Sequence, residues 1–169
     1  MPTLKQYGVL AVGLFTSMGF FLGGISSFSG MVDTQPAQGP DDMNIELPDS
    51  NFNSDGFQRS PEEMFYTAFE HDVVFMNGIY ETEEDQQALE ETLEPLPEQF
   101  ENRVYVGLEN SSDSQLDTAY GVTDYPTVIV VGGNPEAMPQ PITDITTDRM
   151  VQEICNSFNT LDGAAQQCL

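Results

Sequence analysis

The chain has 169 residues, enough for one domain of ordinary size with its own core. Its 28 acidic residues outnumber the four basic ones, which gives a formal net charge of −24 at pH 7. Nucleic acid is excluded as a partner because phosphate contacts need clustered Lys and Arg, whereas Arg59, Arg103 and Arg149 are scattered along the chain.

The acidic residues are spread from Asp33 to Asp162, and lysine is almost absent. Such acidity has two interpretations: a surface that binds cations or basic partners, or adaptation of the whole surface to molar salt. Molar salt screens the repulsion between carboxylates because the Debye length falls to about 3 Å at 1 M. The even spread favours salt adaptation, and the composition resembles that of proteins from extremely halophilic archaea.

Residues 7–32 form an uncharged, mainly apolar run. About 20 helical residues cross the hydrocarbon of a bilayer, so the run predicts one transmembrane helix that contacts membrane lipid. Lys5 precedes the run and Asp33 follows it. Because positive flanks stay in the cytoplasm, residues 1–6 are expected to be a cytoplasmic head. The rest of a single-pass protein of the cell membrane would then face outwards.

A cleavable signal peptide is the alternative reading of the same run, with Ser27-Phe28-Ser29 as its cleavage site. The run is longer than the apolar core of most signal peptides, which favours a retained anchor.

Residues 33–58 are polar, acidic and rich in Pro, Gly, Asn and Ser, a composition that predicts a flexible linker. The remaining residues, 59–169, are expected to form the folded domain. Their patterns predict, in chain order, a helix that begins at Pro61 behind Ser60, a strand over 72–78, a helix behind Thr82 and a strand over 103–108. A short helix over 113–120, a strand over 127–131, an edge strand near 140–143 and a last helix from Thr147 are expected to follow. This order predicts an α/β fold, a mixed sheet with helices on both faces.

One segment of this domain carries a family resemblance. Residues 119–131 read Ala-Tyr-Gly-Val-Thr-Asp-Tyr-Pro-Thr-Val-Ile-Val-Val. The segment resembles the part of thioredoxins in which a helix ends in Tyr-Gly-Val and a Pro-Thr pair then opens an apolar strand. The resemblance implies the thioredoxin fold over residues 60–158, with Pro126 as the cis proline of the family. An ordinary trans proline that opens a strand is the alternative.

The chemistry of the family depends on a Cys-x-x-Cys pair at the turn between the first core strand and the next helix. Aligning this chain with that pattern places Tyr80 and Glu83 near the two thiol positions. Neither side chain is a thiol nucleophile, so ordinary dithiol oxidoreductase activity is not expected. The chain is therefore predicted to be no enzyme of that kind.

The resemblance also implies a groove in which family members hold an extended peptide by backbone pairing. In this chain the groove would be formed by Ile79, Tyr80, Asp124, Tyr125 and Pro126.

The two cysteines lie elsewhere, at Cys155 in the last helix and at Cys168 near the chain end. Outside the cell they are expected to form a structural disulfide that stabilises the fold by about 3 kcal/mol. A reactive or redox-switching pair is the alternative. A zinc site needs more ligands than these two thiols and His71 supply, so no metal or other cofactor is expected.

Asn110-Ser111-Ser112 fits the acceptor pattern for N-glycosylation. The same residues also fit the start of a helix, with Ser112 as its N-cap.

Two functional classes follow. In the first, the membrane-tethered, extracytoplasmic domain lacks redox cysteines and acts as a protein-binding adaptor, or as an accessory subunit of a membrane complex. In the second, it is an atypical thiol-disulfide oxidoreductase that uses Cys155 and Cys168. The missing thiols at the family's site favour the first class.

Overall fold

The computed structural model describes residues 43–159 and Cys168. The predicted membrane segment, residues 7–32, and the first part of the predicted linker lie outside the described residues. Within the described residues, no helix is both long enough and apolar enough to cross a bilayer.

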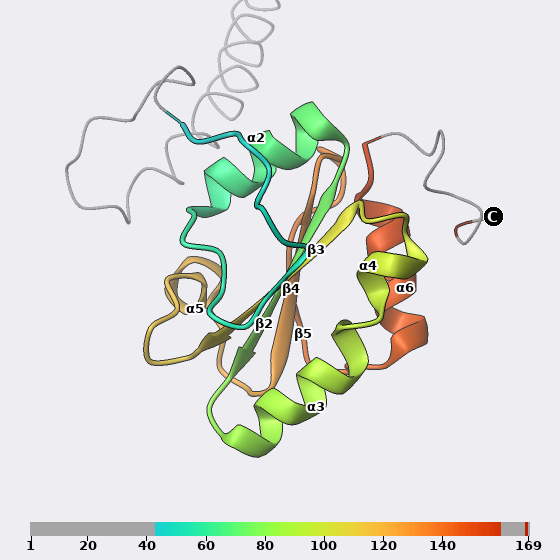
Figure 1. The fold of residues 1–169 in the computed structure, drawn as a ribbon. Helices are drawn as coiled ribbons and strands as arrows, with labels where there is room; N and C mark the ends of the chain where they lie inside the picture. The colour runs from blue at the N-terminus through green and yellow to red at the C-terminus, as the bar shows by residue number, and fades with distance from the viewer. Residues whose placement is uncertain (1–42, 160–167, 169) are drawn as a thin grey trace, which may run out of the picture. The chain divides into compact units, whose positions relative to one another are not determined.

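One mixed sheet runs through the domain (Figure 1). Its strands are β1 (Phe52–Asn53), β2 (Val74–Tyr80), β3 (Val104–Asn110), β4 (Thr127–Gly132) and β5 (Pro141–Ile142), in the order β1-β3-β2-β4-β5. β1, β3 and β2 are parallel, β4 pairs antiparallel with β2, and β5 pairs antiparallel with β4. The central strand β2 is therefore paired on both sides, and it ends where β4 begins.

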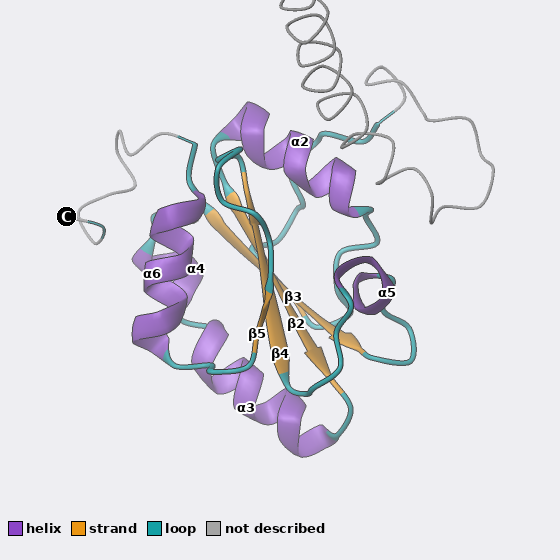
Figure 2. Cartoon of the chain, turned by 180° about the vertical axis from the view of Figure 1, so that it is seen from behind, coloured by secondary structure: helices purple, strands orange, loops and turns teal. Residues whose placement is uncertain are grey.

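Helices cover both faces of this sheet (Figures 1 and 2). One layer holds α2 (Pro61–His71) and α5 (Leu116–Tyr120), and the other holds α3 (Glu83–Leu93), α4 (Leu96–Gln99) and α6 (Thr147–Ser157). Each layer buries its own apolar cluster. Met64, Ala68 and Leu116 pack on the first face of the sheet. Leu89, Leu93, Met150 and Ile154 pack on the second.

The capping signals in the sequence explain where the two helices after the linker start. The Ser60 hydroxyl accepts from the Glu63 backbone N–H at 3.2 Å, and a Glu63 carboxylate oxygen accepts from the Ser60 N–H at 2.9 Å. Thr82 and Asp85 form the same reciprocal pair at the start of α3, with both bonds at 3.2 Å. Each pair satisfies two N–H groups that a helix start leaves unbonded.

The predicted linker, residues 33–58, is too long. The compact unit begins at Met43, and β1 lies inside that supposed linker. Phe52 is opposite Val106 on β3, and Phe57 is buried beside Phe75, with ring centroids 5.3 Å apart. A two-residue strand has no detectable periodicity, so polar composition concealed its pairing with the sheet.

Two further boundaries differ from prediction. α3 ends at Leu93, shortly before Pro95, and a four-residue helix that was not predicted, α4, follows at once and buries Leu96. The helix expected over 113–120 begins only at Leu116.

The α/β class and the mixed sheet with helices on both faces are confirmed. The strand order and directions make the fold thioredoxin-like.

Candidate functional site

The peptide bond between Tyr125 and Pro126 is cis, as the resemblance implies. β4 begins at the next residue, Thr127, which lies opposite Ile79 on β2. This register brings Pro126 to the level of Tyr80, the last residue of β2. The antiparallel pairing therefore joins two segments of the predicted groove that are more than forty positions apart in the sequence.

Four of the five predicted groove residues, Pro126 among them, are accessible, and one is not. Tyr80 and Tyr125 are partly buried, and Asp124 is exposed beside Thr123, whose hydroxyl donates to its Oδ2 at 3.0 Å. Ile79 was predicted to line the groove, but its exposed fraction is 0%. It belongs to the cluster under α2 and α5, because successive side chains of a strand point to opposite faces of the sheet. Ile79 therefore supports the groove from within the core.

The turn where the family carries its thiols is short and acidic. β2 ends at Tyr80, Thr82 is the N-cap, and α3 begins at Glu83. Three carboxylates, Glu83, Glu84 and Asp85, occupy its first turn. They complement the partial positive charge of the helix start, the charge that lowers the pKa of a thiol in redox proteins. This helix end thus stabilises carboxylates.

Tyr125 is held in a fixed position at the groove. Its hydroxyl donates to Asp117 Oδ2 on α5 at 2.6 Å. That hydrogen bond, some burial and the negative charges of Asp117 and Glu81 raise the pKa of Tyr125 to about 12. The phenol therefore stays protonated at neutral pH and acts only as a hydrogen-bond donor to its carboxylate partner.

Asp117, the hydrogen-bond partner of Tyr125, forms with Glu109 a pair of carboxyl groups that the sequence analysis did not single out. Burial raises the pKa of Glu109, and the nearby charge of Asp117 raises it further, whereas hydrogen bonds from Ser114 and the Phe57 backbone oppose the shift. Asp117 Oδ1 is buried and has no hydrogen-bond partner among the described residues. Since carboxylates are so frequent in this chain, spacing alone could not distinguish this pair.

The two cysteines form the predicted disulfide. Cys155 on α6 is bonded to Cys168, with Cα atoms 5.5 Å apart, and both side chains pack on the cluster under α3, α4 and α6. α6 lies on the opposite face of the sheet from α5, which carries Asp117 (Figure 2). The Cys155–Cys168 disulfide attaches Cys168 to the core on the face of the sheet away from Asp117.

Asn110 ends β3, and its side-chain oxygen accepts from the Ser112 N–H at 3.0 Å and the Ser112 hydroxyl at 2.7 Å. The reading of Ser112 as a helix N-cap is wrong, because α5 starts at Leu116 and the Ser114 hydroxyl accepts from its N–H. Glycosylation of Asn110 stays a prediction.

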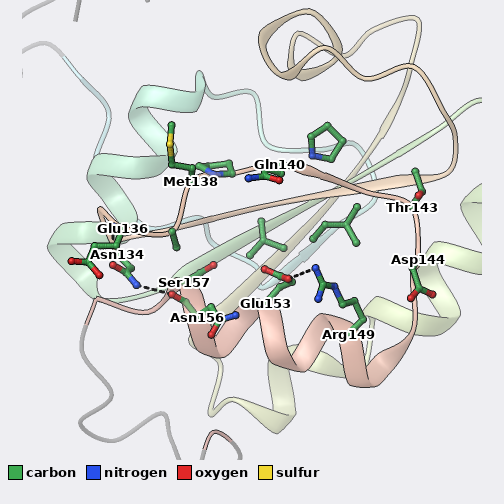
Figure 3. Close-up of a pocket in the computed structure, with 15 residues that line it drawn as sticks. Asn134, Glu136, Met138, Gln140, Thr143, Asp144, Arg149, Glu153, Asn156 and Ser157 are labelled. Atoms are coloured by element: carbon green, nitrogen blue, oxygen red, sulfur yellow. Dashed lines mark hydrogen bonds and ion pairs between the residues drawn. The ribbon is translucent and has the colours of Figure 1, made fainter. Parts of the chain in front are cut away.

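A separate cleft of about 820 Å³ lies between the loop after β4 and α6 (Figure 3). Its walls are mostly polar: Asn134 Nδ2 donates to the Asn156 carbonyl at 2.7 Å, and Arg149 pairs with Glu153 at 2.6 Å. None of the predicted site residues lines this cleft. Nowhere in the part of the chain that is described do three His, Cys, Asp or Glu residues gather in a way that could hold a metal ion.

No protein-family model matches the sequence, and no curated protein matches it either. Among solved structures, a mutant thioredoxin from Halobacterium salinarum is 20% identical, with a TM-score of 0.46 over 64% of this chain and 91% of that one. Spinach chloroplast thioredoxin f is 14% identical, with a TM-score of 0.45 over 63% and 87% of the two chains. Chloroplastic thioredoxin z is 15% identical, with a TM-score of 0.41 over 53% and 80%. The fold assignment rests on the sheet topology and the cis proline, not on these matches.

Proposed function

We propose that this protein is a membrane-tethered, extracytoplasmic binding domain that acts as an adaptor or as an accessory subunit of a membrane complex. Residues 7–32 would be its retained anchor, and the groove beside Pro126 would be its contact surface. The proposal makes the domain non-catalytic.

One observation carries the proposal. The Tyr125–Pro126 bond is cis and lies beside the end of β2, while the turn that would hold the thiols reads Tyr80-Glu81-Thr82-Glu83. A cis proline at this place in the fold, without thiols at the neighbouring turn, supports binding of an extended segment without thiol exchange.

The fixed position of Tyr125 is also consistent with binding. Its hydrogen bond to Asp117 fixes the rim of the groove before any partner arrives, and a preorganised site loses less conformational entropy on association. An extended segment of a partner would lie along the backbone next to Pro126, between Tyr80 and Asp124.

The test is photo-cross-linking of the full-length protein in native membranes at its working salt, with the reactive side chain at Tyr80. The matched control carries it at Glu91, which is exposed on α3 outside the groove. A partner linked at stoichiometric yield from position 80 but not from position 91 is expected. Equal labelling from both positions would count against the groove as the contact surface.

The same experiment tests the competing redox function. Under that function, substrates would be trapped as mixed disulfides with Cys155 or Cys168. Their recovery on non-reducing gels, with loss in the Cys155→Ser variant, would replace the adaptor proposal with the oxidoreductase one.

A further inference from the structure

α2 carries three neighbouring aromatic side chains, Phe65, Tyr66 and Phe69, called here the α2 aromatic face, of which Phe65 also packs on the core beneath the helix. The ring centroids of Phe65 and Tyr66 are 5.8 Å apart, and those of Phe65 and Phe69 are 6.4 Å apart. Tyr66 is 42% exposed and Phe69 is 48% exposed. The helix already buries Met64 and Ala68 on its other side, so the sheet does not need this second apolar face.

The described chain begins alongside the same helix. Arg59 Nη1 donates to the Asn44 carbonyl at 3.3 Å, and the His71 ring nitrogen lies 2.9 Å from the Ile45 carbonyl oxygen. This first segment adds exposed apolar surface of its own, because Ile45 is 39% exposed and Leu47 is 38% exposed. Four of the five large apolar side chains found exposed among the described residues thus belong to α2 or to the segment beside it.

Few residues separate this side of the domain from the proposed membrane anchor. Only residues 33–42 separate the apolar run 7–32 from Met43. Ten fully extended residues span at most about 36 Å, so the place where the chain enters the domain cannot lie farther than that from the outer end of an anchor.

We propose that the α2 aromatic face, together with Ile45 and Leu47, rests in the interfacial region of the bilayer in which the chain is anchored. The inference rests on the anchor of the proposed function. Aromatic side chains favour the boundary between headgroups and hydrocarbon. A short tether supplies an effective concentration that compensates for the weak affinity of a few side chains.

The negative charge of this surface indicates which lipid headgroups it can contact. Glu62 and Glu70 lie on the same exposed side of α2, and the whole chain carries −24. Anionic headgroups repel such a surface at low salt and do so much less at molar salt. The occupant is therefore an uncharged or salt-screened lipid surface. The same two carboxylates oppose a dimer of two α2 faces, since a two-fold contact would bring like charges together.

The sequence contains no tryptophan, so one introduced indole reports its own surroundings. The experiment uses the full-length chain with Phe69→Trp, reconstituted into phosphatidylcholine vesicles whose acyl chains are brominated near the headgroup. The matched control is Glu91→Trp on α3, which covers the other face of the sheet. Bromine should quench the emission of Trp at position 69, and the apolar surroundings should shift that emission to the blue, whereas the emission of Trp at position 91 should stay unchanged.

Vesicle flotation separates failure of the contact from failure of the anchor. If the chain floats with the vesicles while position 69 is quenched no more than position 91, the contact is refuted and the anchor stands. If the chain does not float, the anchor and the contact both fall. A blue shift without quenching that grows with protein density would assign the face to a second copy of the chain and overturn the inference.

Discussion

Replacing Asn77 with leucine is expected to stabilise the domain. Asn77 lies in the middle of β2, opposite Gly107 on β3 and Ile129 on β4, and its exposed fraction is 0%. Neither its Nδ2 nor its Oδ1 has a hydrogen-bond partner among the described residues. Folding therefore removes an amide from water without replacing its hydrogen bonds, which costs about 1–3 kcal/mol.

Leucine is larger than asparagine but has the same branched arrangement of four side-chain heavy atoms and no polar atoms, so Asn77→Leu should recover most of that cost. The expected gain of about 1–3 kcal/mol raises Tm by roughly 4–12 °C for a domain of this size. Thermal unfolding followed by circular dichroism, at fixed salt, measures the difference. The matched variant is Asn77→Asp, which buries a carboxyl group at the same position and should destabilise the fold at pH 7 and less so in acid.

The result that refutes this reasoning is a lower Tm for Asn77→Leu. It would mean that the amide is satisfied in the folded protein, for example by a buried water, so that leucine removes bonds instead of an unpaired group.

Three further predictions concern the carboxyl pair, the disulfide and the groove. The pKa of Glu109 is raised above its ordinary value of 4.5, so the folded state binds that proton more tightly than the unfolded chain does. Glu109→Gln should therefore be more stable than the parent protein at pH 7, and urea titrations should show the advantage vanish as the pH falls through the raised pKa towards 4.5. Changing both Cys155 and Cys168 to serine should lower the free energy of unfolding by about 3 kcal/mol in denaturant titrations; an unchanged midpoint would argue against a structural bond. Tyr125→Phe removes the phenol with a pKa of about 12, so the ultraviolet tyrosinate titration should lose its latest component; loss of an earlier one would place the Asp117 hydrogen bond in doubt.

The sequence predicted those parts of the fold that local chemistry determines. Ser60, Pro61 and Glu63 begin α2 as their order requires, because the cap is complete within four residues. Thr82 and Asp85 do the same for α3. In the groove, the cis bond at Pro126 was predictable because a specific run of neighbouring residues carries it.

The missed features depend on pairing between distant segments. β1 pairs with β3, where Phe52 lies opposite Val106. The Asn51 side chain adds a hydrogen bond, from its Nδ2 to the Val104 carbonyl at 3.0 Å. The composition of residues 43–58 does not reveal either contact. Asn77 reads as one polar residue in an apolar run until its neighbours on β3 and β4 are known. Ile79 was assigned to the groove because sequence adjacency to Tyr80 does not reveal which face of the sheet a side chain occupies.

The acidic residues divide into those that help the fold and those that oppose it. Glu63 caps α2, and hydrogen bonds to Ser60 lower its pKa, so its charge favours folding. Glu83 and Asp85 meet the favourable end of a helix dipole.

Glu109 and Asp117 are different, because one is buried against the preference of its charged form and the other has a buried oxygen without a partner in the described chain. Salt adaptation would account for acids that solvent surrounds, but it gives no reason to place two partly buried carboxyl groups near each other. Proteins tend to break such local rules at functional sites, and Asp117 accepts a hydrogen bond from Tyr125, the residue before the cis proline. The folding cost of this pair therefore supports the proposal that the domain binds a partner at this end of the sheet.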